Sequence, residues 1–498
     1  MSESPLRRLV RNTAGYSFST LAGPLFTLLL TPVYTRLLTA ADYGTVDTLT
    51  MLGTVLFLIG TLGIAPALTA LYYAPEHSAE QPRLLASALW AAVGWSGAVA
   101  AAAILLAEPI ARLALAREDV TGLVRLAAAG LPFGVISAVQ TAALRLRFAV
   151  WRGNVLALGT LLASVGANVL LVLVLRWGST GVIAALTTTN VVSALIGLAL
   201  APEGLRARPR PDLMAALVRG GLPLLPAGLA SWALLYADRL FLVRAVSLDQ
   251  IGIYAIAVKL SSLLGVLIEP FKSAWSPISL SIGEQPEAPA LYARVLTYFC
   301  AAACGLALAV SLFAHEVLLV FTTPAYLGAA DYVWLLALSP VASGVATVVS
   351  VGLYLSRRLG PIGWGAAAAA AVNLLLNLLL IPRYGVTGAA LATALGYSAT
   401  PLVVAIFAQR TRWLPFRWRD VAVVTAVYLG LVGAGGLVGS RLDLTSLGLR
   451  AALLLAYLPL LRLLGVLDDA ALQAAWRAVR QPRLLLRPLR AQQGEEAP

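Results

Sequence analysis

Charged side chains are scarce in this chain of 498 residues: Asp, Glu, Lys and Arg together make up 12% of it. Soluble domains carry about twice that share. They are also far less apolar than a chain with 60% hydrophobic residues and a mean hydropathy of +0.85. The shortage of charge therefore excludes an ordinary soluble globular domain. Lysine is the scarcest cation, with two residues against 34 arginines, so each lysine is easy to single out.

The residues that usually form disulfides and metal sites are also rare. Cys300 and Cys304 are the only cysteines and lie one helical turn apart in an apolar run, where small core residues are expected. The two histidines, His77 and His315, lack the neighbouring ligands that a metal ion needs. We therefore expect no metal site, no cofactor and no catalytic residues.

Long apolar runs are what the chain has in abundance. A bilayer core of about 30 Å needs about 20 apolar residues per helical crossing. Stretches of about this length cover residues 12–35, 44–73, 84–107, 120–144, 153–175, 179–200, 216–243, 250–275, 291–314, 329–355, 360–381, 385–408, 418–438 and 446–464. The sequence thus predicts an all-α polytopic membrane protein with about 14 transmembrane helices.

The loops between these runs are short and rich in arginine. Many arginines lie in the even-numbered loops and in the two terminal segments, for example Arg83, Arg152 and Arg206. Because cytoplasmic loops carry an excess of positive charge, both termini are expected on the cytoplasmic side. This placement accounts for the net charge of +13 without nucleic acid as a partner. The short loops also leave no room for a soluble catalytic domain, so an enzyme is not expected.

The two halves of the chain repeat one another. Arg11, Arg36 and Gly44 recur 208 residues later as Arg219, Arg244 and Gly252, and residues 176–181 recur 207 residues later as 383–388. Each repeat holds six spans, an even number, so both copies enter the membrane in the same orientation. This arrangement is typical of transporters in which two parallel lobes enclose a central cavity and rock to give alternating access.

The repeat divides the chain into four expected parts. These are an N-terminal six-helix lobe at 11–200, a C-terminal six-helix lobe at 216–409, two additional helices at 418–464 and a basic tail at 468–498. In the tail, Leu472, Trp476 and Val479 recur at helical spacing among arginines. That pattern favours an amphipathic cytoplasmic segment on the membrane surface, and a solvated tail is the alternative.

Charged residues at membrane depth indicate a cavity, because they are costly in hydrocarbon. Lys259 lies about ten residues into its span, about 15 Å deep at 1.5 Å per residue. The repeat places Met51 at the matching position, so this cation belongs to the second lobe alone. A lone cation in a cavity suits an anionic ligand such as a phosphate. The alternative is a structural pair with a carboxylate such as Asp238.

Further charged residues lie toward the outer ends of the lobes. Asp238 and Arg239 lie in the outer third of the span 216–243, and different partners are expected for them because adjacent helical residues do not face each other. The two equivalent outer elbows are flanked by Arg36, Asp42, Arg244 and Asp249. These four are candidates for a gate that forms and breaks during transport, or for helix caps and salt bridges.

At the opposite, inner ends, three arginines are candidates for the mouth of a basic cavity. Arg145 and Arg147 end the span 120–144, and Arg219 begins the span 216–243. The charge that fixes membrane topology would also place arginines here, so a purely topogenic role is the alternative.

Three stretches of the chain resemble the polysaccharide-repeat flippase family. This family comprises the O-antigen and exopolysaccharide translocases of the multidrug/oligosaccharidyl-lipid/polysaccharide exporter superfamily. The stretches are TPVYTRLLTAADYG at 31–44, GLPLLPAG at 221–228 with the following ADR at 237–239 and GIY at 252–254, and FKSAWSP at 271–277. The resemblance extends over about residues 11–409.

The resemblance implies a cargo of undecaprenyl-diphosphate-linked oligosaccharide, moved from the inner to the outer leaflet of the bacterial cytoplasmic membrane. It also implies a cationic cavity, with Lys259, Arg239 and Arg219 as the first candidates and Arg145 and Arg147 beside them. Membrane lipids, a polysaccharide polymerase and other assembly proteins are the expected partners.

Two other cargoes fit the same fold. A peptidoglycan lipid precursor shares the diphosphate lipid and would need the same basic cavity. A cation-coupled exporter of drugs or metabolites would favour buried carboxylates, whereas the deepest charge here is the positive Lys259. A membrane enzyme acting on the same lipid would need a large extramembrane loop or a carboxylate constellation, and the sequence has neither.

Overall fold

The computed structural model describes residues 30–77, 80–283, 285–358, 360–438 and 443–467, and these fold into helices with no strand among them. The first half contains α2 (Thr31–Leu37), α3 (Ala40–Thr61), α4 (Ile64–Tyr72), η1 (Pro75–His77), α5 (Gln81–Leu105), α6 (Ala107–Leu115), α7 (Thr121–Leu146), α8 (Val150–Asn168), the π-helical η2 (Val169–Val174), α9 (Gly178–Leu200), α10 (Glu203–Arg206) and α11 (Pro211–Gly221). The second half contains η3 (Leu222–Leu224), α12 (Leu225–Tyr236), α13 (Asp238–Ala245), α14 (Leu248–Ser281), α15 (Ala288–Leu312), α16 (Ala314–Phe321), η4 (Pro324–Ala329), α17 (Ala330–Leu336), α18 (Leu338–Val349), α19 (Val351–Leu355), α20 (Gly360–Thr411), α21 (Trp418–Val438) and α22 (Leu444–Leu463).

The expected membrane spans are present as helices. Among the described residues, twelve helical segments are long and apolar enough to cross a membrane. One of them, α20, holds two predicted spans, because Gly385 interrupts it with a φ of 54° and a ψ of −128°. The first predicted span, 12–35, lies mostly outside the described residues, and α2 is its end. The prediction of an all-α, multi-pass membrane protein with about 14 helices is confirmed, while the tail 468–498 lies outside the described residues.

The internal repeat is visible in the backbone. Gly178 and Gly385, which lie 207 residues apart, both begin a helix with a positive φ, 57° and 54°. Three residues further on, Gly181 and Gly388 each pack against the backbone of the preceding helix, at the carbonyl groups of Leu171 and Leu380. A side chain at either position would clash with that carbonyl, so the repeated glycines are needed for the same tight helical turn.

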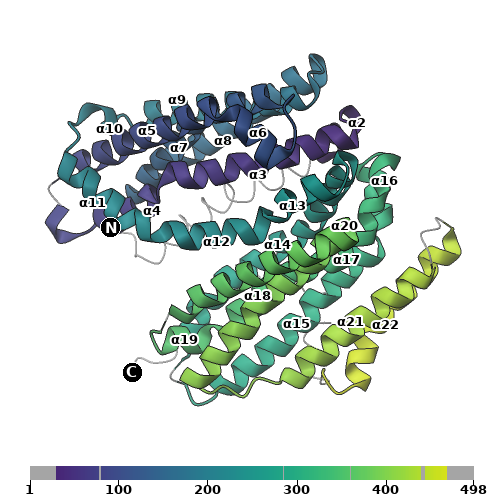
Figure 1. The fold of residues 1–498 in the computed structure, drawn as a ribbon. Coiled ribbons are helices and arrows are strands. Elements are labelled where there is room, and N and C mark those ends of the chain that lie inside the picture. Colours follow the sequence, from purple (N-terminus) through teal and green to yellow (C-terminus); the bar gives the residue numbers. More distant parts are fainter. Residues whose placement is uncertain (1–29, 78–79, 284, 359, 439–442, 468–498) are drawn as a thin grey trace.

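The helices form two bundles (Figure 1). In the first bundle, α3 to α11, helix α7 packs against α5 and α9 around buried residues such as Leu68, Leu131 and Val135. In the second bundle, α12 to α20, helices α14, α15, α18 and α20 pack together. Helices α21 and α22 lie against α15, where Tyr428 and Tyr457 complete the core.

The bundles meet where α3 crosses α14. One apolar cluster includes Leu38 at the end of α2 and Tyr43 in α3 together with Ile251, Tyr254 and Tyr326 from the second half. Figure 1 shows the bundles close together near α2, α13 and α16 and spread apart toward α11 and α19. We call the first end, which carries the starts of α3 and α14, the elbow end. The other, which carries Arg145, Arg147 and Arg219, is the basic end.

Equivalent caps begin α3 and α14 at the elbow end. Thr39 accepts a hydrogen bond from the Asp42 backbone, and the Asp42 carboxylate accepts one from the Thr39 backbone, which is a capping box. Ser247 and Gln250 form the same box at the start of α14. Such reciprocal bonds satisfy backbone groups that a helix start leaves free, so the repeat preserves the geometry of both elbows.

Candidate functional site

Lys259 is held by tyrosines at the crossing of the two bundles. Its Nζ donates a hydrogen bond of 3.1 Å to the hydroxyl of Tyr43 on α3, and it lies 6.0 Å and 5.8 Å from the ring centres of Tyr34 and Tyr43. A cation over aromatic faces is attracted by the ring quadrupole. No carboxylate of the described residues lies within 4.0 Å of Lys259, whereas Lys272, the other lysine, pairs with Glu269 at 2.6 Å. The alternative pairing of Lys259 with Asp238 is therefore not formed.

A buried ion-pair network links α3 to α13 beside Lys259. Arg239 Nε donates to Asp47 Oδ2 at 3.0 Å, and Arg239 Nη1 donates to Asp238 Oδ1 at 2.8 Å. The hydroxyl of Tyr254 donates to Asp238 Oδ2 at 2.5 Å. The Arg239 side chain is 3% exposed, and a buried guanidinium is tolerated when its donors are satisfied in this way.

Asp238 and Arg239 each have a separate partner, as expected, but the expectation that they do not face each other was wrong. The two side chains bond to each other because α12 ends and α13 begins at this point, and Asp238 also accepts from the Arg239 backbone at 3.0 Å. The sequence interpretation also missed Asp47. Its position one helical turn after Tyr43, as an acidic residue within the apolar run 44–73, was the available signal.

The four elbow residues lie at the elbow end as predicted, but their contacts differ. Asp42 caps α3, while the cap of α14 uses Gln250, so Asp249 is exposed in the first turn without a capping role. Arg244 donates to the Leu113 carbonyl at the end of α6, which joins the two bundles. Arg36 is exposed in the last turn of α2. A gating role for these residues stays a prediction.

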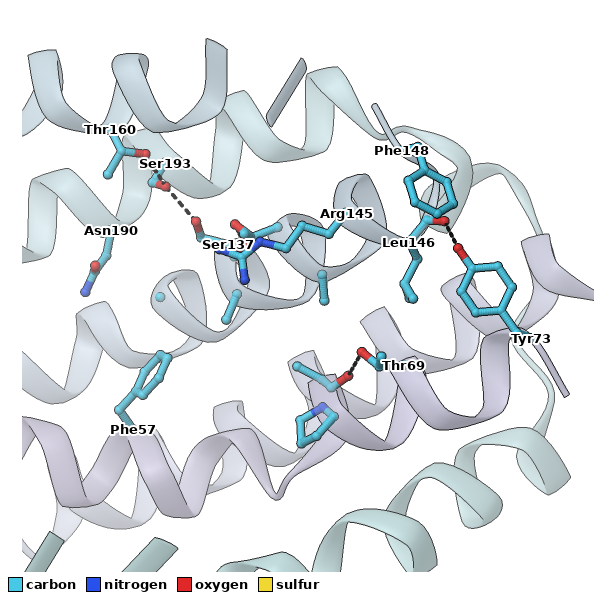
Figure 2. A pocket seen from close by; sticks show the side chains of 16 residues that line it. Phe57, Thr69, Tyr73, Ser137, Arg145, Leu146, Phe148, Thr160, Asn190 and Ser193 are labelled. Carbon is cyan, nitrogen blue, oxygen red and sulfur yellow. Dashed lines mark hydrogen bonds between the residues drawn. The ribbon is translucent and has the colours of Figure 1, made fainter. Parts of the chain in front are cut away.

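A pocket lies within the first bundle and reaches the basic end (Figure 2). Its volume is about 860 Å³, and it lies between α3, α4, α7, α8 and α9. Its lining is Phe57, Ala65, Pro66, Thr69, Tyr73, Gly134, Ser137, Ala138, Thr141, Ala142, Arg145, Leu146, Phe148, Thr160, Asn190 and Ser193. Small residues on α7, namely Gly134, Ala138 and Ala142, leave the space that the pocket occupies.

The polar groups that line this pocket are mostly hydroxyls, with one positive charge. Among the described residues, Arg145 is the only charged one in the lining, and none of the others carries a carboxylate. Hydroxyl groups come from four helices (α4, α7, α8 and α9), and three aromatic rings (Phe57, Tyr73 and Phe148) stand around it. Figure 2 shows Tyr73 bonded through its hydroxyl to the Leu146 carbonyl. An anionic, hydroxylated molecule matches such a lining better than a cation does.

The two other inner arginines are not part of this pocket. Arg147 forms an ion pair of 2.5 Å with Glu203 on α10, and Arg152 lies 4.0 Å from the same carboxylate. Burial alone would raise the pKa of Glu203, but the hydrogen bond from Arg147 and the charges of both arginines hold it below its usual range. Arg219 is exposed in the last turn of α11. The five predicted cationic residues thus do not line one cavity: only Lys259 and Arg239 lie together, at the crossing of the bundles.

Among the residues that the structure describes, no group of His, Cys, Asp and Glu side chains could hold a metal ion. Cys300 and Cys304 are buried free cysteines in the core around α15. The site therefore consists of two parts: the charged crossing with Lys259 and Arg239, and the first-bundle pocket with Arg145.

Solved structures with this fold are flippases and transporters. The first is described as "Lipid II flippase MurJ, inward closed conformation", with a TM-score of 0.69 and 13% identity over 96% of this chain and 100% of that one. An inward-facing multidrug resistance MATE family transporter of the MOP superfamily gives a TM-score of 0.60 and 13% identity, covering 81% of this chain and 95% of the other. A structure described as the outward-facing conformation of a multidrug resistance MATE family transporter of the MOP superfamily gives a TM-score of 0.56 and 14% identity, covering 85% of this chain and 97% of the other. These identities are too low to show more than a shared fold.

The family follows from the sequence comparison. The family described as "Polysaccharide biosynthesis protein" matches residues 9–282, which is more than half of the chain. The chain therefore belongs to this family, and its fold is that of the MOP-superfamily flippases and transporters. No curated protein matches the sequence.

Proposed function

We propose that the protein flips undecaprenyl-diphosphate-linked oligosaccharides from the cytoplasmic to the outer leaflet of a bacterial cytoplasmic membrane, for surface polysaccharide assembly. The observation that carries the proposal is the first-bundle pocket, whose described lining combines one arginine with hydroxyl and aromatic side chains and contains no carboxylate. A diphosphate needs a cation, and sugars need hydroxyl partners.

Positive charge at the basic end supports the direction of transport. Because arginine-rich loops remain in the cytoplasm, the basic end is the cytoplasmic side and both termini are cytoplasmic. The bundles are spread apart at that end and packed together at the elbow end (Figure 1). This conformation would admit cargo from the inner leaflet, and alternating access would then close the basic end and open the elbow end.

The moving parts are proposed to be the two repeats, residues 11–200 and 216–409, with 418–464 as an additional helix pair. The contacts that α3 and the end of α2 make with the second bundle would break in the outward-open state. They include Tyr43–Lys259 at 3.1 Å, Asp47–Arg239 at 3.0 Å and the Tyr326 hydroxyl on the Leu38 carbonyl at 3.1 Å. Lys259 and Arg239 would then face the cavity as cargo-binding cations, in addition to Arg145 in the first-bundle pocket.

The lining of the pocket disfavours export of cationic drugs, since a cationic cargo would need a carboxylate there and none of the lining residues that the structure describes has one. A peptidoglycan lipid precursor is the second candidate. It is favoured by the similarity to the Lipid II flippase, which covers that chain completely. Deletion distinguishes the two cargoes, because loss of a peptidoglycan precursor flippase is expected to be lethal and loss of a surface-polysaccharide flippase is not.

The experiment that tests the proposal measures the sidedness of diphosphate-linked oligosaccharide lipid in cells without the protein. We expect this lipid to accumulate in the inner leaflet and surface polymer to disappear. Normal outer-leaflet lipid without polymer would contradict flipping and indicate a downstream step such as polymerisation. An unchanged lipid pool with intact polymer would indicate export of small molecules instead. A polysaccharide polymerase and other assembly proteins are the proposed partners after translocation.

A further inference from the structure

Three hydroxyl groups meet in the part of the first-bundle pocket that lies away from Tyr73 and Phe148. Ser193 Oγ on α9 lies 2.6 Å from Ser137 Oγ on α7 and 2.8 Å from Thr160 Oγ1 on α8. Ser193 is 4% exposed, whereas Arg145, Tyr73 and Phe148 at the other end are exposed. We call Ser137, Thr160 and Ser193 the hydroxyl triad. Figure 2 shows it at one end of the pocket, with Tyr73 and Phe148 at the other.

Helix α7 connects the triad to the arginine along one face. Ser137, Thr141 and Arg145 recur every fourth residue, so they lie one above another on the helix. Eight residues separate Ser137 from Arg145, which corresponds to about 12 Å at 1.5 Å per residue. Helical side chains lean toward the N-terminus, so Arg145 extends back toward Ser137, as Figure 2 also shows.

The depth of the triad suits a head group that enters from the basic end. Ser137, Thr160 and Ser193 each lie seven to ten residues from the basic-end terminus of their helices. At 1.5 Å per residue this is about 10–15 Å into the bundle. A lipid diphosphate near Arg145 would therefore place the first sugars beside the triad, while the polyprenyl chain stays in the bilayer.

Hydroxyl groups are well suited to recognise sugars in this position. Each hydroxyl both donates and accepts, and its hydrogen rotates to fit its partner. The Asn190 side chain adds an amide to the same wall, and Phe57 adds an apolar ring. Without a ligand the three hydroxyls bond to one another, and a sugar hydroxyl could extend or replace these bonds, whereas a ligand without hydroxyls gains no hydrogen bond here.

We propose that the hydroxyl triad is a sugar subsite that selects the cargo by its oligosaccharide, with Arg145 holding the neighbouring phosphate at the mouth of the pocket. This inference rests on the proposed flippase function and names the part of the molecule that would read the sugar. It assigns affinity for the diphosphate to Arg145 and discrimination between head groups to the triad.

The test compares binding of two lipids to the purified full-length protein. The probes are undecaprenyl diphosphate without sugar and the undecaprenyl-diphosphate-linked oligosaccharide isolated from cells that lack the protein. The test variant carries Ser137→Ala, Thr160→Val and Ser193→Ala. Because all three hydroxyls of the triad are removed together, none of them is left without its partner. The matched control is Thr189→Val on α9, whose hydroxyl bonds only the Ala185 carbonyl of its own helix and does not line the pocket.

We expect the unmodified protein and Thr189→Val to bind the sugar-bearing lipid more tightly than the sugar-free one. The triple variant should lose about tenfold in affinity for the sugar-bearing lipid and bind the sugar-free lipid normally, which also shows that it is folded. Arg145→Gln should weaken binding of both lipids. A triple variant that keeps its preference for the sugar-bearing lipid, or loses affinity for both lipids alike, would overturn the sugar subsite. If the unmodified protein binds neither lipid, the proposed function itself fails, and the subsite fails with it.

Discussion

Gly44 and Gly252, which occupy the same position in the two repeats, lie against each other where α3 crosses α14. A Cβ added to Gly44 would lie 3.0 Å from the Gly252 nitrogen, and one added to Gly252 would lie 3.1 Å from the Gly44 nitrogen. Each would come closer still to a carbonyl oxygen, that of Leu248 or Ala40. The close approach of the two bundles at the elbow end therefore depends on both residues lacking a side chain.

Replacing either glycine by alanine is expected to separate the helices at the elbow end. Because the neighbouring atoms belong to the backbone, the added methyl group can be accommodated only by moving α3 from α14, at a cost of about 1–3 kcal/mol. We expect Gly44→Ala and Gly252→Ala to lower the thermal unfolding midpoint in detergent and to reduce transport at least several-fold. Gly53→Ala and Gly265→Ala, on the same helices with open space around them, are the controls. Unfolding midpoints equal to those of the controls would refute the argument.

Arg239 should be more important for stability than either of its acidic partners. Arg239→Gln leaves Asp47 and Asp238 without a cation, and losing one member of a buried ion pair typically costs about 3–5 kcal/mol. Asp47→Asn should cost less, because Arg239 keeps its bond of 2.8 Å to Asp238. Thermal unfolding in detergent measures both. Arg112→Gln, which breaks only exposed pairs with Glu108 and Glu118, should change little. Equal losses for Arg239→Gln and Asp47→Asn would contradict this ranking.

Lys259 is expected to be needed for transport rather than for folding. It has no carboxylate partner within 4.0 Å among the described residues, and its hydrogen bond goes to Tyr43. Lys259→Ala should abolish or cripple polymer export at an unchanged protein level. Tyr43→Phe keeps the aromatic ring and the lysine charge and serves as the comparison, with most of the export retained. Full export by Lys259→Ala at normal expression would show that the charge is dispensable.

The ion pair of Arg147 with Glu203 predicts a pH dependence of stability. The pKa of Glu203 is held below its ordinary value of 4.5 in the folded protein. The stabilisation is therefore fully present above pH 4.5 and is lost as the pH falls through the lowered folded value. Glu203→Gln should lower the unfolding midpoint above pH 4.5, and the difference from the unmodified protein should shrink below it. Glu76→Gln, at an exposed site, is the control. A difference that does not change with pH would mean that the charge of Glu203 contributes nothing.

The architecture was predictable because the length of each apolar run and the repeat can both be read directly from the order of residues in the chain. Gly44 and Gly252 could be paired by their spacing before the structure placed them in contact. The break at Gly385 likewise separates the two spans expected on either side of it. The pairing of bundles, by contrast, depends on where helices cross, and spacing along the chain does not contain that information.

The site was predictable only in part, for the same reason. Lys259 stood out by its depth, but its tyrosine partners lie more than 200 residues away in the sequence. The bond between Asp238 and Arg239 required knowledge of the break between α12 and α13. The hydroxyl triad was invisible because single Ser and Thr residues are common in membrane helices, and only the convergence of α7, α8 and α9 gives Ser193 its neighbours.

The additional helices α21 and α22 are fastened to one bundle. Tyr428 donates to the Trp334 carbonyl at 2.6 Å, Tyr457 donates to the Ala301 carbonyl at 2.8 Å, and Arg450 pairs with Glu316. If the bundles rock, the second bundle therefore carries this pair with it and must push aside more lipid than its partner does. The drag of the displaced lipid on this helix pair would then slow the motion of the second bundle. The rate of the transport cycle would therefore depend on the viscosity and lateral pressure of the surrounding bilayer.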